Sequence, residues 1–283
     1  LYIVSEGLGD GVIQLNNNGE FLGFFTSNKT RIGFLERLQD IIFTAEIKEK
    51  LFPRLPPIFS GIYVKEETGL VYTTAFNSPG SAVKKHNIAG SNMLGDIVDF
   101  REEPVAITVD DAGTIYAGYR RGTIAVFTGE GKLLFRFGAD SGRVDISGLF
   151  NRLSGICVDG RGNIWAVDFE KGFLQRFTPT DYALDIQRAL EEYNLGLYED
   201  AKSTWQAVLV RNEMSVLAHL GLAQVHMLQQ NYIDAASEYA LAGDRSSYSQ
   251  AYWEVRNQFL QRHAGKFIFA VLGLFFIRLL YKA

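Results

Sequence analysis

Two stretches of this sequence match each other at a fixed separation: Val109-Asp-Asp-Ala-Gly-Thr-Ile-Tyr-Ala117 and Val158-Asp-Gly-Arg-Gly-Asn-Ile-Trp-Ala166. Valine, aspartate, glycine, isoleucine and alanine are identical at a shift of 49 residues. In both stretches apolar residues flank an Asp-x-x-Gly segment, which is typical of two half-buried strands joined by a tight turn. The repeat therefore predicts strand hairpins that recur along the chain.

Further copies extend this pattern over the first part of the chain. A looser copy runs from Ile62 to Tyr72, and an incomplete copy runs from Leu1 to Val4. We expect later strands of the same units at 12–15, 82–84, 123–127 and 173–177, and again at 19–25, 90–94 and 131–137. Because four antiparallel strands make one blade of a β-propeller, the sequence predicts about four blades over residues 1–180.

The segment from Asp159 to Asp168, followed by a strand that contains phenylalanine, resembles a blade of the NHL type. The resemblance covers about residues 1–180 and implies a propeller architecture, but it implies little about function. The preceding copy departs from the pattern, because Tyr119 stands where the later copy has Asp168. Propellers of this type usually close with six blades, so we expect the remaining blades to lie upstream of Leu1.

A segment at 30–51 interrupts the blade pattern. Its apolar residues follow helical spacing, at Phe34, Leu38, Ile41 and Ile42 among others, and charged residues fill the other face. We expect a helix here. It is either an outer helix that covers an exposed edge or a docking helix for a partner or for a membrane surface.

A second module, residues 181–263, shows helical periodicity and a repeat of 34 residues. The matched pairs are Ala189 with Ala223, Tyr198 with Tyr232, Asp200 with Asp234, Ala201 with Ala235, and Trp205 with Tyr239. This pattern resembles tetratricopeptide repeats, which implies that small residues let paired helices approach closely and that aromatic residues fill the space between repeats. The sequence departs from that family where a repeat usually ends in proline, since Glu213 and Ser247 stand there.

The tetratricopeptide resemblance also implies a short superhelix with one concave face. The residues expected on that face are Ile186, Leu190, Asn194, Leu220, Gln224 and Met227. The set is largely apolar, so we expect it to contact a protein surface or the chain's own propeller rather than an acidic tail.

The last segment, 264–283, is an apolar stretch of 15 residues between Lys266 and Lys282. A helix of that length rises about 22 Å, against about 30 Å for the hydrocarbon core of a bilayer. Because apolar residues cover every face, we predict a transmembrane helix that is cut off by the end of the chain, with a buried core helix as the alternative. The predicted anchor residues are Phe267, Phe269, Leu272, Phe275 and Arg278.

The composition and the single cysteine exclude several kinds of site. The 28 basic and 32 acidic residues give a net charge of −4, which argues against nucleic-acid binding by phosphate neutralisation. Cys157 is the sole cysteine, so neither an intrachain disulfide nor a paired-cysteine metal site is available, and its apolar strand predicts a buried thiol. The 4 histidines show no metal-ligand spacing.

Carboxylates remain as candidates for chemistry. Propeller lactonases of the gluconolactonase type hold one divalent cation through carboxylates and amides. The candidate residues of this chain are Asp110, Asp159 and Asp168 at repeat turns, and Asp99, Asp145 and Asn151 in loops. The turn positions predict caps of tight turns rather than metal ligands. The loop positions form no recognisable motif.

Together these patterns predict a multidomain β and α protein: a propeller portion, a short helical superhelix and a membrane helix. We expect a membrane-anchored, non-enzymatic scaffold without cofactor or metal, an accessory subunit of a membrane complex such as a transporter, with the propeller outside the cytoplasm of a bacterial cell. Two alternatives remain open. One is a propeller lactonase or hydrolase with a divalent metal, and the other is an extracytoplasmic carbohydrate-binding sensor.

Overall fold

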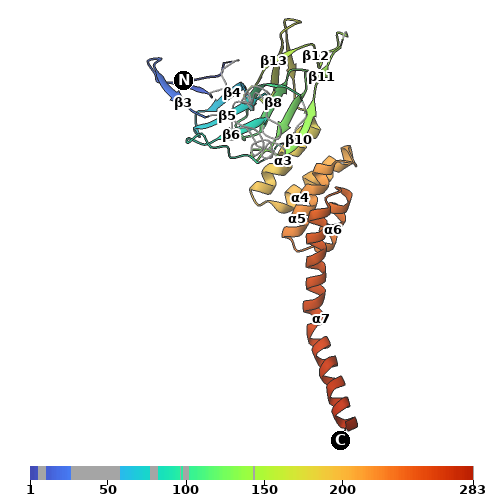
Figure 1. Ribbon diagram of the computed structural model, residues 1–283. Coiled ribbons are helices and arrows are strands. Elements are labelled where there is room, and N and C mark those ends of the chain that lie inside the picture. The colour runs from blue at the N-terminus through green and yellow to red at the C-terminus, as the bar shows by residue number, and fades with distance from the viewer. Residues whose placement is uncertain are drawn as a thin grey trace, which may run out of the picture. The chain divides into compact units, whose positions relative to one another are not determined.

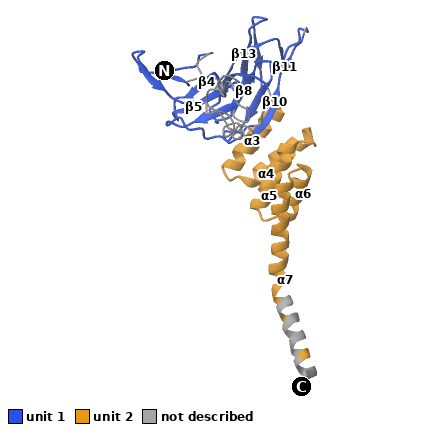
Figure 2. Ribbon diagram, in the orientation of Figure 1, with its two compact units in different colours: residues 1–178 blue, residues 179–283 orange. Residues whose placement is uncertain are grey.

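The computed structural model describes residues 1–5, 11–26, 58–76, 82–95, 97, 102–142 and 144–282, with the side chains of 266–268, 270–277 and 279–282 left out (Figure 1). The chain divides into two compact units, Leu1–Thr178 and Pro179–Ala283 (Figure 2). The helix expected at 30–51, including Phe34, Leu38, Ile41 and Ile42, lies outside the described residues.

The first unit is built from antiparallel sheets that follow one another along the chain. The first sheet contains β1 (Tyr2–Ile3), β2 (Ile13–Leu15) and β3 (Phe21–Phe24), and the second contains β4 (Phe59–Lys65), β5 (Leu70–Ala75) and β6 (Val83–His86). The third contains β7 (Pro104–Val109), β8 (Ile115–Tyr119), β9 (Ile124–Phe127) and β10 (Leu133–Phe137). The fourth contains β13 (Leu153–Val158), β14 (Ile164–Asp168) and β15 (Phe173–Phe177), and a short parallel pair, β11 (Ala139–Asp140) and β12 (Leu149–Phe150), precedes it.

Neighbouring sheets lie side by side through their first strands. β4 lies next to β7, and β7 lies next to β13. This succession of antiparallel sheets, each stacked on the next, is a propeller-like arrangement (Figure 1). Most strands expected from the sequence repeat form where they were predicted, but the strand expected at 90–94 does not: only an isolated bridge joins Asn92 to His86, so the second sheet has three strands.

The core of the first unit lies between the second and third sheets. Its members are mainly aliphatic and aromatic: Tyr72, Val83, Leu94, Ile97, Ile107, Val109, Ile115, Ala117, Tyr119, Ala125 and Phe127. Every residue of β8 and β9 is buried, so the third sheet is covered on both faces. Burial of apolar area on this scale is the main stabilising contribution to the unit.

Two lysines link the second sheet to the turns of the third. The Lys65 Nζ atom donates to the carbonyl oxygens of Asp110 and Asp111 at 2.9 and 2.8 Å. The Lys85 Nζ atom donates to the carbonyl oxygen of Gly129 at 3.0 Å. In each case the acceptor is a main-chain oxygen of the neighbouring turn.

The prediction of a buried Cys157 is wrong, because this residue is exposed. It pairs across strands with Trp165, which in turn pairs with Arg176, and so it lies on the face of the fourth sheet that points away from the third. Alternation along β13 identified the residues that share a face. It did not show whether that face is covered.

The second unit is helical. It contains α3 (Asp181–Asn194), α4 (Tyr198–Arg211), α5 (Val216–Leu228), α6 (Tyr232–Leu241) and α7 (Arg245–Lys282). Side-chain caps fix two helix starts: the Thr180 and Ser215 hydroxyls accept from the backbone N–H groups of Ala183 and Ala218. Each helix packs against the next one along the chain, so α3–α4 and α5–α6 form two successive helical pairs.

Small residues and an aromatic ring set the spacing of these pairs. Ala189 and Ala223 are fully buried, as the repeat pattern predicted. Trp205 is buried against Gly221, where an added Cβ would lie 2.3 Å from the indole ring. Glycine at this point of α5 therefore allows the close contact between α4 and α5.

The C-terminal helix α7 runs without a break through the segment predicted to enter a membrane. Among the residues described, no helix combines the length and the apolar character that crossing a bilayer requires. Of the predicted anchor residues, Phe269 and Arg278 are exposed. The side chains of Phe267, Leu272 and Phe275 lie outside the described set.

Candidate functional site

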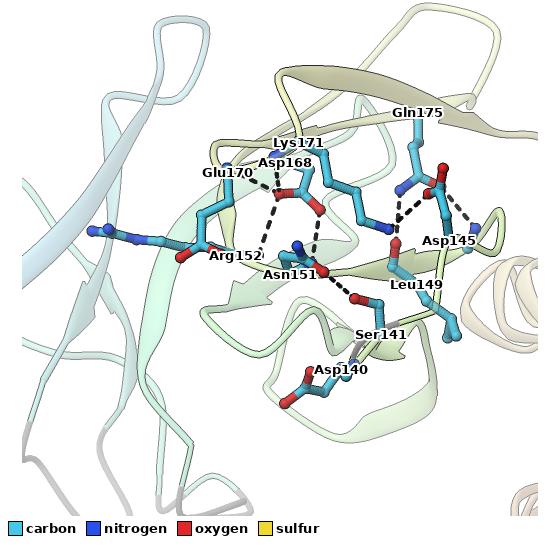
Figure 3. A network of polar contacts seen from close by, with 12 residues as sticks. Asp140, Ser141, Asp145, Leu149, Asn151, Arg152, Asp168, Glu170, Lys171 and Gln175 are labelled. Carbon is cyan, nitrogen blue, oxygen red and sulfur yellow. Dashed lines mark hydrogen bonds and ion pairs between the residues drawn. The ribbon is translucent and has the colours of Figure 1, made fainter.

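A network of polar contacts between charged and amide side chains lies at one end of the fourth sheet (Figure 3). It joins the segment between β10 and β13 to the turn between β14 and β15. Its members are Asp140, Ser141, Asp145, Leu149, Asn151, Arg152, Asp168, Glu170, Lys171 and Gln175. Two of the loop candidates from the sequence, Asp145 and Asn151, thus lie with Asp168.

Asp168 is the centre of this network and is fully buried. Its Oδ2 atom accepts from the backbone N–H of Asn151 at 2.7 Å. Its Oδ1 atom accepts from the backbone N–H groups of Arg152, Glu170 and Lys171 at 3.3, 3.1 and 3.2 Å. The carboxylate therefore ties the start of β13 to the β14–β15 turn through main-chain donors.

Burial and hydrogen bonding act on the Asp168 carboxyl in opposite directions. Burial raises its pKa, but the backbone N–H donors stabilise the charged form and hold the pKa below the ordinary aspartate value. The group is therefore an anion at neutral pH. With both oxygens occupied by backbone donors, it is a structural carboxylate and not a general base.

Five further polar side chains of the network bond to other parts of the chain. The Lys171 ammonium contacts Asp145 Oδ1 at 3.0 Å, and its side chain is largely buried. The Ser141 hydroxyl donates to the side-chain oxygen of Asn151. Gln175 accepts from the Gly148 N–H at 2.7 Å and donates to the Leu149 carbonyl at 3.0 Å. These contacts hold the loops of the network to one another.

The aspartates at the other repeat turns are turn caps, as the sequence predicted. Asp110 Oδ1 accepts from the Thr114 N–H at 2.8 Å. Asp159 Oδ1 accepts from the Asn163 N–H at 2.9 Å, and Asp159 Oδ2 accepts from Trp165 Nε1 at 3.0 Å. Hydrogen bonds from the Asn163 and Trp165 side chains hold the pKa of Asp159 well below its usual range.

The described residues contain no group of three or more histidine, cysteine, aspartate or glutamate side chains that could hold a metal ion. Asp99, the remaining loop candidate, lies outside the described residues. His86 is buried and bonded on both nitrogens, to Thr73 Oγ1 at 2.8 Å and to the Gly90 carbonyl at 3.1 Å. His219 contacts Glu238 at 2.6 Å.

The residues predicted on a concave helical face occupy different environments. Ile186 is fully buried, whereas Asn194 is exposed. Leu190 and Gln224 are half-buried. Leu220 and Met227 pack against a small core of Ala223, Ala235, Ala236, Tyr239 and Ala251. These two members of the set therefore support the packing of α5, α6 and α7.

Large apolar side chains are instead exposed at the turns between the helices. Leu195 at the α3–α4 turn is 67% exposed, Met214 at the α4–α5 turn is 84% exposed, and Ile233 at the start of α6 is 72% exposed. Val210, near the end of α4, is 88% exposed. Helical periodicity did not identify these residues. The available signal was an aliphatic residue in or beside a turn.

Comparisons with known proteins found similar solved structures of low identity. No family model matches this chain, and no curated protein matches it. Similar solved structures include virginiamycin B lyase from Staphylococcus aureus (16% identity, TM-score 0.31, 43% of this chain and 42% of the lyase). They also include a streptogramin B lyase (16%, 0.37, 63% and 54%) and the extracellular domain of the one-component system BT4673 from B. thetaiotaomicron (12%, 0.40, 63% and 20%). The chain spans about half the length of the two lyases.

Proposed function

We propose that this protein is a non-enzymatic interaction protein that is anchored to a membrane by its C-terminal helix. In this proposal the sheets belong to an NHL-type propeller outside the cytoplasm, and the helical pairs are tetratricopeptide-like repeats. Its partner is a protein subunit of a membrane complex, for example a transporter.

The observation that carries the proposal is the exposure of large aliphatic side chains at the helix turns. Leaving an apolar side chain of this size in water forgoes roughly 1.5–3 kcal/mol of burial per residue. Val210 lies near the end of α4, and Met214 lies in the turn that follows it. Both therefore belong to one corner of the helical unit. Exposed apolar side chains that gather in one place favour a protein-binding role.

The polar network of the fourth sheet supports the non-enzymatic part of the proposal. An active site needs groups that are free to donate, accept or attack. Asp168, Asn151 and Lys171 each bond to other parts of the chain. The network therefore favours a role in holding loops in place over a role in catalysis.

Purification of the full-length protein from its native membrane in mild detergent, followed by mass spectrometry, tests this proposal. We expect proteins that co-purify at fixed stoichiometry. Val210→Glu combined with Met214→Glu places two charges in the exposed corner and should lower their recovery at least tenfold. Gln250→Glu adds a charge at an exposed polar position of α7 and serves as the control. Absence of any stoichiometric partner would contradict the proposal.

A further inference from the structure

The part of α7 that follows its contact with α6 presents its side chains outward. Ala251 is the last buried residue among the described side chains of α7, and it packs in the small core beside α6. From 256 to 265 every residue is exposed except Asn257 and His263, which are half-buried. This part of α7 therefore offers a surface that the helical unit itself does not cover.

Two adjacent large apolar side chains are exposed on this surface. Phe259 is 56% exposed and Leu260 is 54% exposed. One turn later, the His263 Nδ1 atom donates to the Phe259 carbonyl oxygen at 2.9 Å, and the two rings stack with their centres 4.3 Å apart. His263 thus supports the exposed Phe259 ring. Apolar side chains held out in this way indicate an interaction surface.

Positive charge surrounds this apolar pair. Arg256 and Arg262 are both exposed, and they lie one helical turn before and one helical turn after Phe259. No aspartate or glutamate follows Glu254 in the sequence, whereas arginine or lysine recurs at 256, 262, 266, 278 and 282. The whole chain has a net charge of −4, so this positive stretch is a local feature. Charge complementarity therefore points to an anionic partner.

These side chains point to different sides of the helix. Successive residues of an α-helix are rotated by about 100°, since 3.6 residues make one turn. Leu260 and Arg262 are therefore about 200° apart, on nearly opposite sides of α7. A groove of a protein partner covers one face of a helix. A layer of lipid headgroups surrounds a helix that passes through it, and so it contacts both sides at once.

The same residues lie at the depth that a headgroup layer requires. Because α7 is continuous and rises about 1.5 Å per residue, Arg262 lies about 3 Å, Phe259 about 8 Å and Arg256 about 12 Å before the apolar segment that begins at 264. The headgroup layer is about 5–8 Å thick on each side of the hydrocarbon core. Phe259 and Arg262 therefore fall at this layer, and the long side chain of Arg256 can reach it.

Four residues of α7, which we call the collar, combine these properties: Arg256, Phe259, Leu260 and Arg262. We propose that the collar binds the headgroups of anionic phospholipids. The two guanidinium groups bind lipid phosphates in a layer of net negative charge, and the Phe259 and Leu260 side chains pack between the headgroups. This inference rests on the membrane anchoring proposed above, and it holds for either side of the membrane.

Lipid binding by the full-length protein in mild, neutral detergent tests the charged half of the collar. Phosphatidylglycerol and phosphatidylcholine are titrated separately, and native mass spectrometry counts the molecules that stay bound. We expect tighter binding of phosphatidylglycerol. Each basic residue near an anionic surface contributes about fivefold in affinity, so Arg256→Gln combined with Arg262→Gln should weaken phosphatidylglycerol binding about 20-fold. Arg161→Gln combined with Arg245→Gln removes the same charge from exposed positions outside the collar and should leave the affinity unchanged.

Fluorescence quenching tests the apolar half of the collar. The protein is reconstituted into vesicles of phosphatidylglycerol and phosphatidylcholine whose acyl chains carry bromine close to the headgroup. Phe259→Trp adds an indole to the collar, and we expect these lipids to quench the emission that it adds to that of the wild type. Gln250→Trp adds an indole at an exposed position about 14 Å farther from the apolar segment, and its added emission should not be quenched.

Flotation with vesicles of phosphatidylcholine alone separates the collar from the membrane anchor. The wild type and the double arginine variant of the collar should both float, because the apolar segment needs no anionic lipid. Failure of the wild type to float would contradict the membrane anchoring, and the collar with it. If the wild type floats but binds the two lipids equally, the collar alone is overturned. The same holds if the Arg161 and Arg245 control weakens binding as much as the collar variant does, or if the added indole at 259 is not quenched.

Discussion

Replacing Asp168 by asparagine tests whether the buried carboxylate holds the fourth sheet together. In the wild type the two carboxylate oxygens accept from four backbone N–H groups. An asparagine keeps one oxygen and replaces the other by an NH₂ group. If the amide oxygen serves the Arg152, Glu170 and Lys171 donors, the NH₂ group faces the N–H of Asn151, and two donors meet.

The expected cost follows from that mismatch. A lost hydrogen bond to a charged group, together with a buried donor left without a partner, costs roughly 2–3 kcal/mol of unfolding free energy. Asp168→Ala removes the acceptor for all four donors and should cost more. Asp159→Asn is the matched control, because Asp159 caps a turn of the same sheet but is accessible to solvent, and its loss should be smaller.

Urea unfolding followed by hydrogen-exchange mass spectrometry measures these losses, since it reports the β13–β15 peptides separately from the helices. The pKa of Asp168 is lower in the folded chain than in the unfolded chain, so its carboxylate stabilises the fold fully above the unfolded-state pKa. The wild type should therefore lose stability as the pH falls below about 4, toward the pKa of the folded chain. Asp168→Asn should lack this component. Equal stability of Asp168→Asn and the wild type would refute the reasoning.

Three further outcomes are expected. Burial lowers the pKa of His86 to about 4, so the unfolded chain binds a proton at higher pH than the folded chain does. The unfolding free energy of the first unit should therefore fall by about 3 kcal/mol as the pH drops from 6.5 to 4. The stability of His86→Gln should depend less on pH in this range. Gln230 has a φ of 60° at the position equivalent to Gly196. Gln230→Gly should therefore stabilise the helical unit by about 1 kcal/mol and raise its urea midpoint. An unchanged midpoint would count against strain at this turn. Gly221→Ala forces a methyl group into the Trp205 ring and should lower stability by about 1–3 kcal/mol in the same assay, whereas a neutral result would mean that α4 and α5 can separate freely.

The strands and helical pairs could be predicted because their signals are local. Alternation of apolar residues and the Asp-x-x-Gly turns located β7–β8 and β13–β14, and the repeat of 34 residues located the helical pairs. The same alternation could not show that Cys157 is exposed, because exposure depends on whether another sheet covers its face. Periodicity likewise predicted a shared face for Ile186 and Asn194, but it did not show that Ile186 is buried and Asn194 exposed.

The polar network could be predicted only in part. The sequence identified Asp168 as a turn residue and Asp145 and Asn151 as loop residues. It gave no sign that Asp168 accepts from Asn151, because that bond joins residues 17 positions apart through a main-chain N–H. Because the donor is a main-chain N–H, almost any residue could supply it. Only the path of the backbone shows it.

The lysine links between the second and third sheets have a consequence for how this chain can evolve. Lys65 and Lys85 bond to carbonyl oxygens, which every residue possesses, and not to particular side chains. Substitutions in the neighbouring turns therefore preserve these links as long as the turn keeps its backbone shape, which the positive φ of Gly113 and Gly131 helps to maintain. Selection on such a joint acts on the lysine and on the residues that hold the shape of the turn, such as the Asp110 cap and the glycines. Other turn residues can change, so the repeats can diverge in sequence while the sheets remain joined.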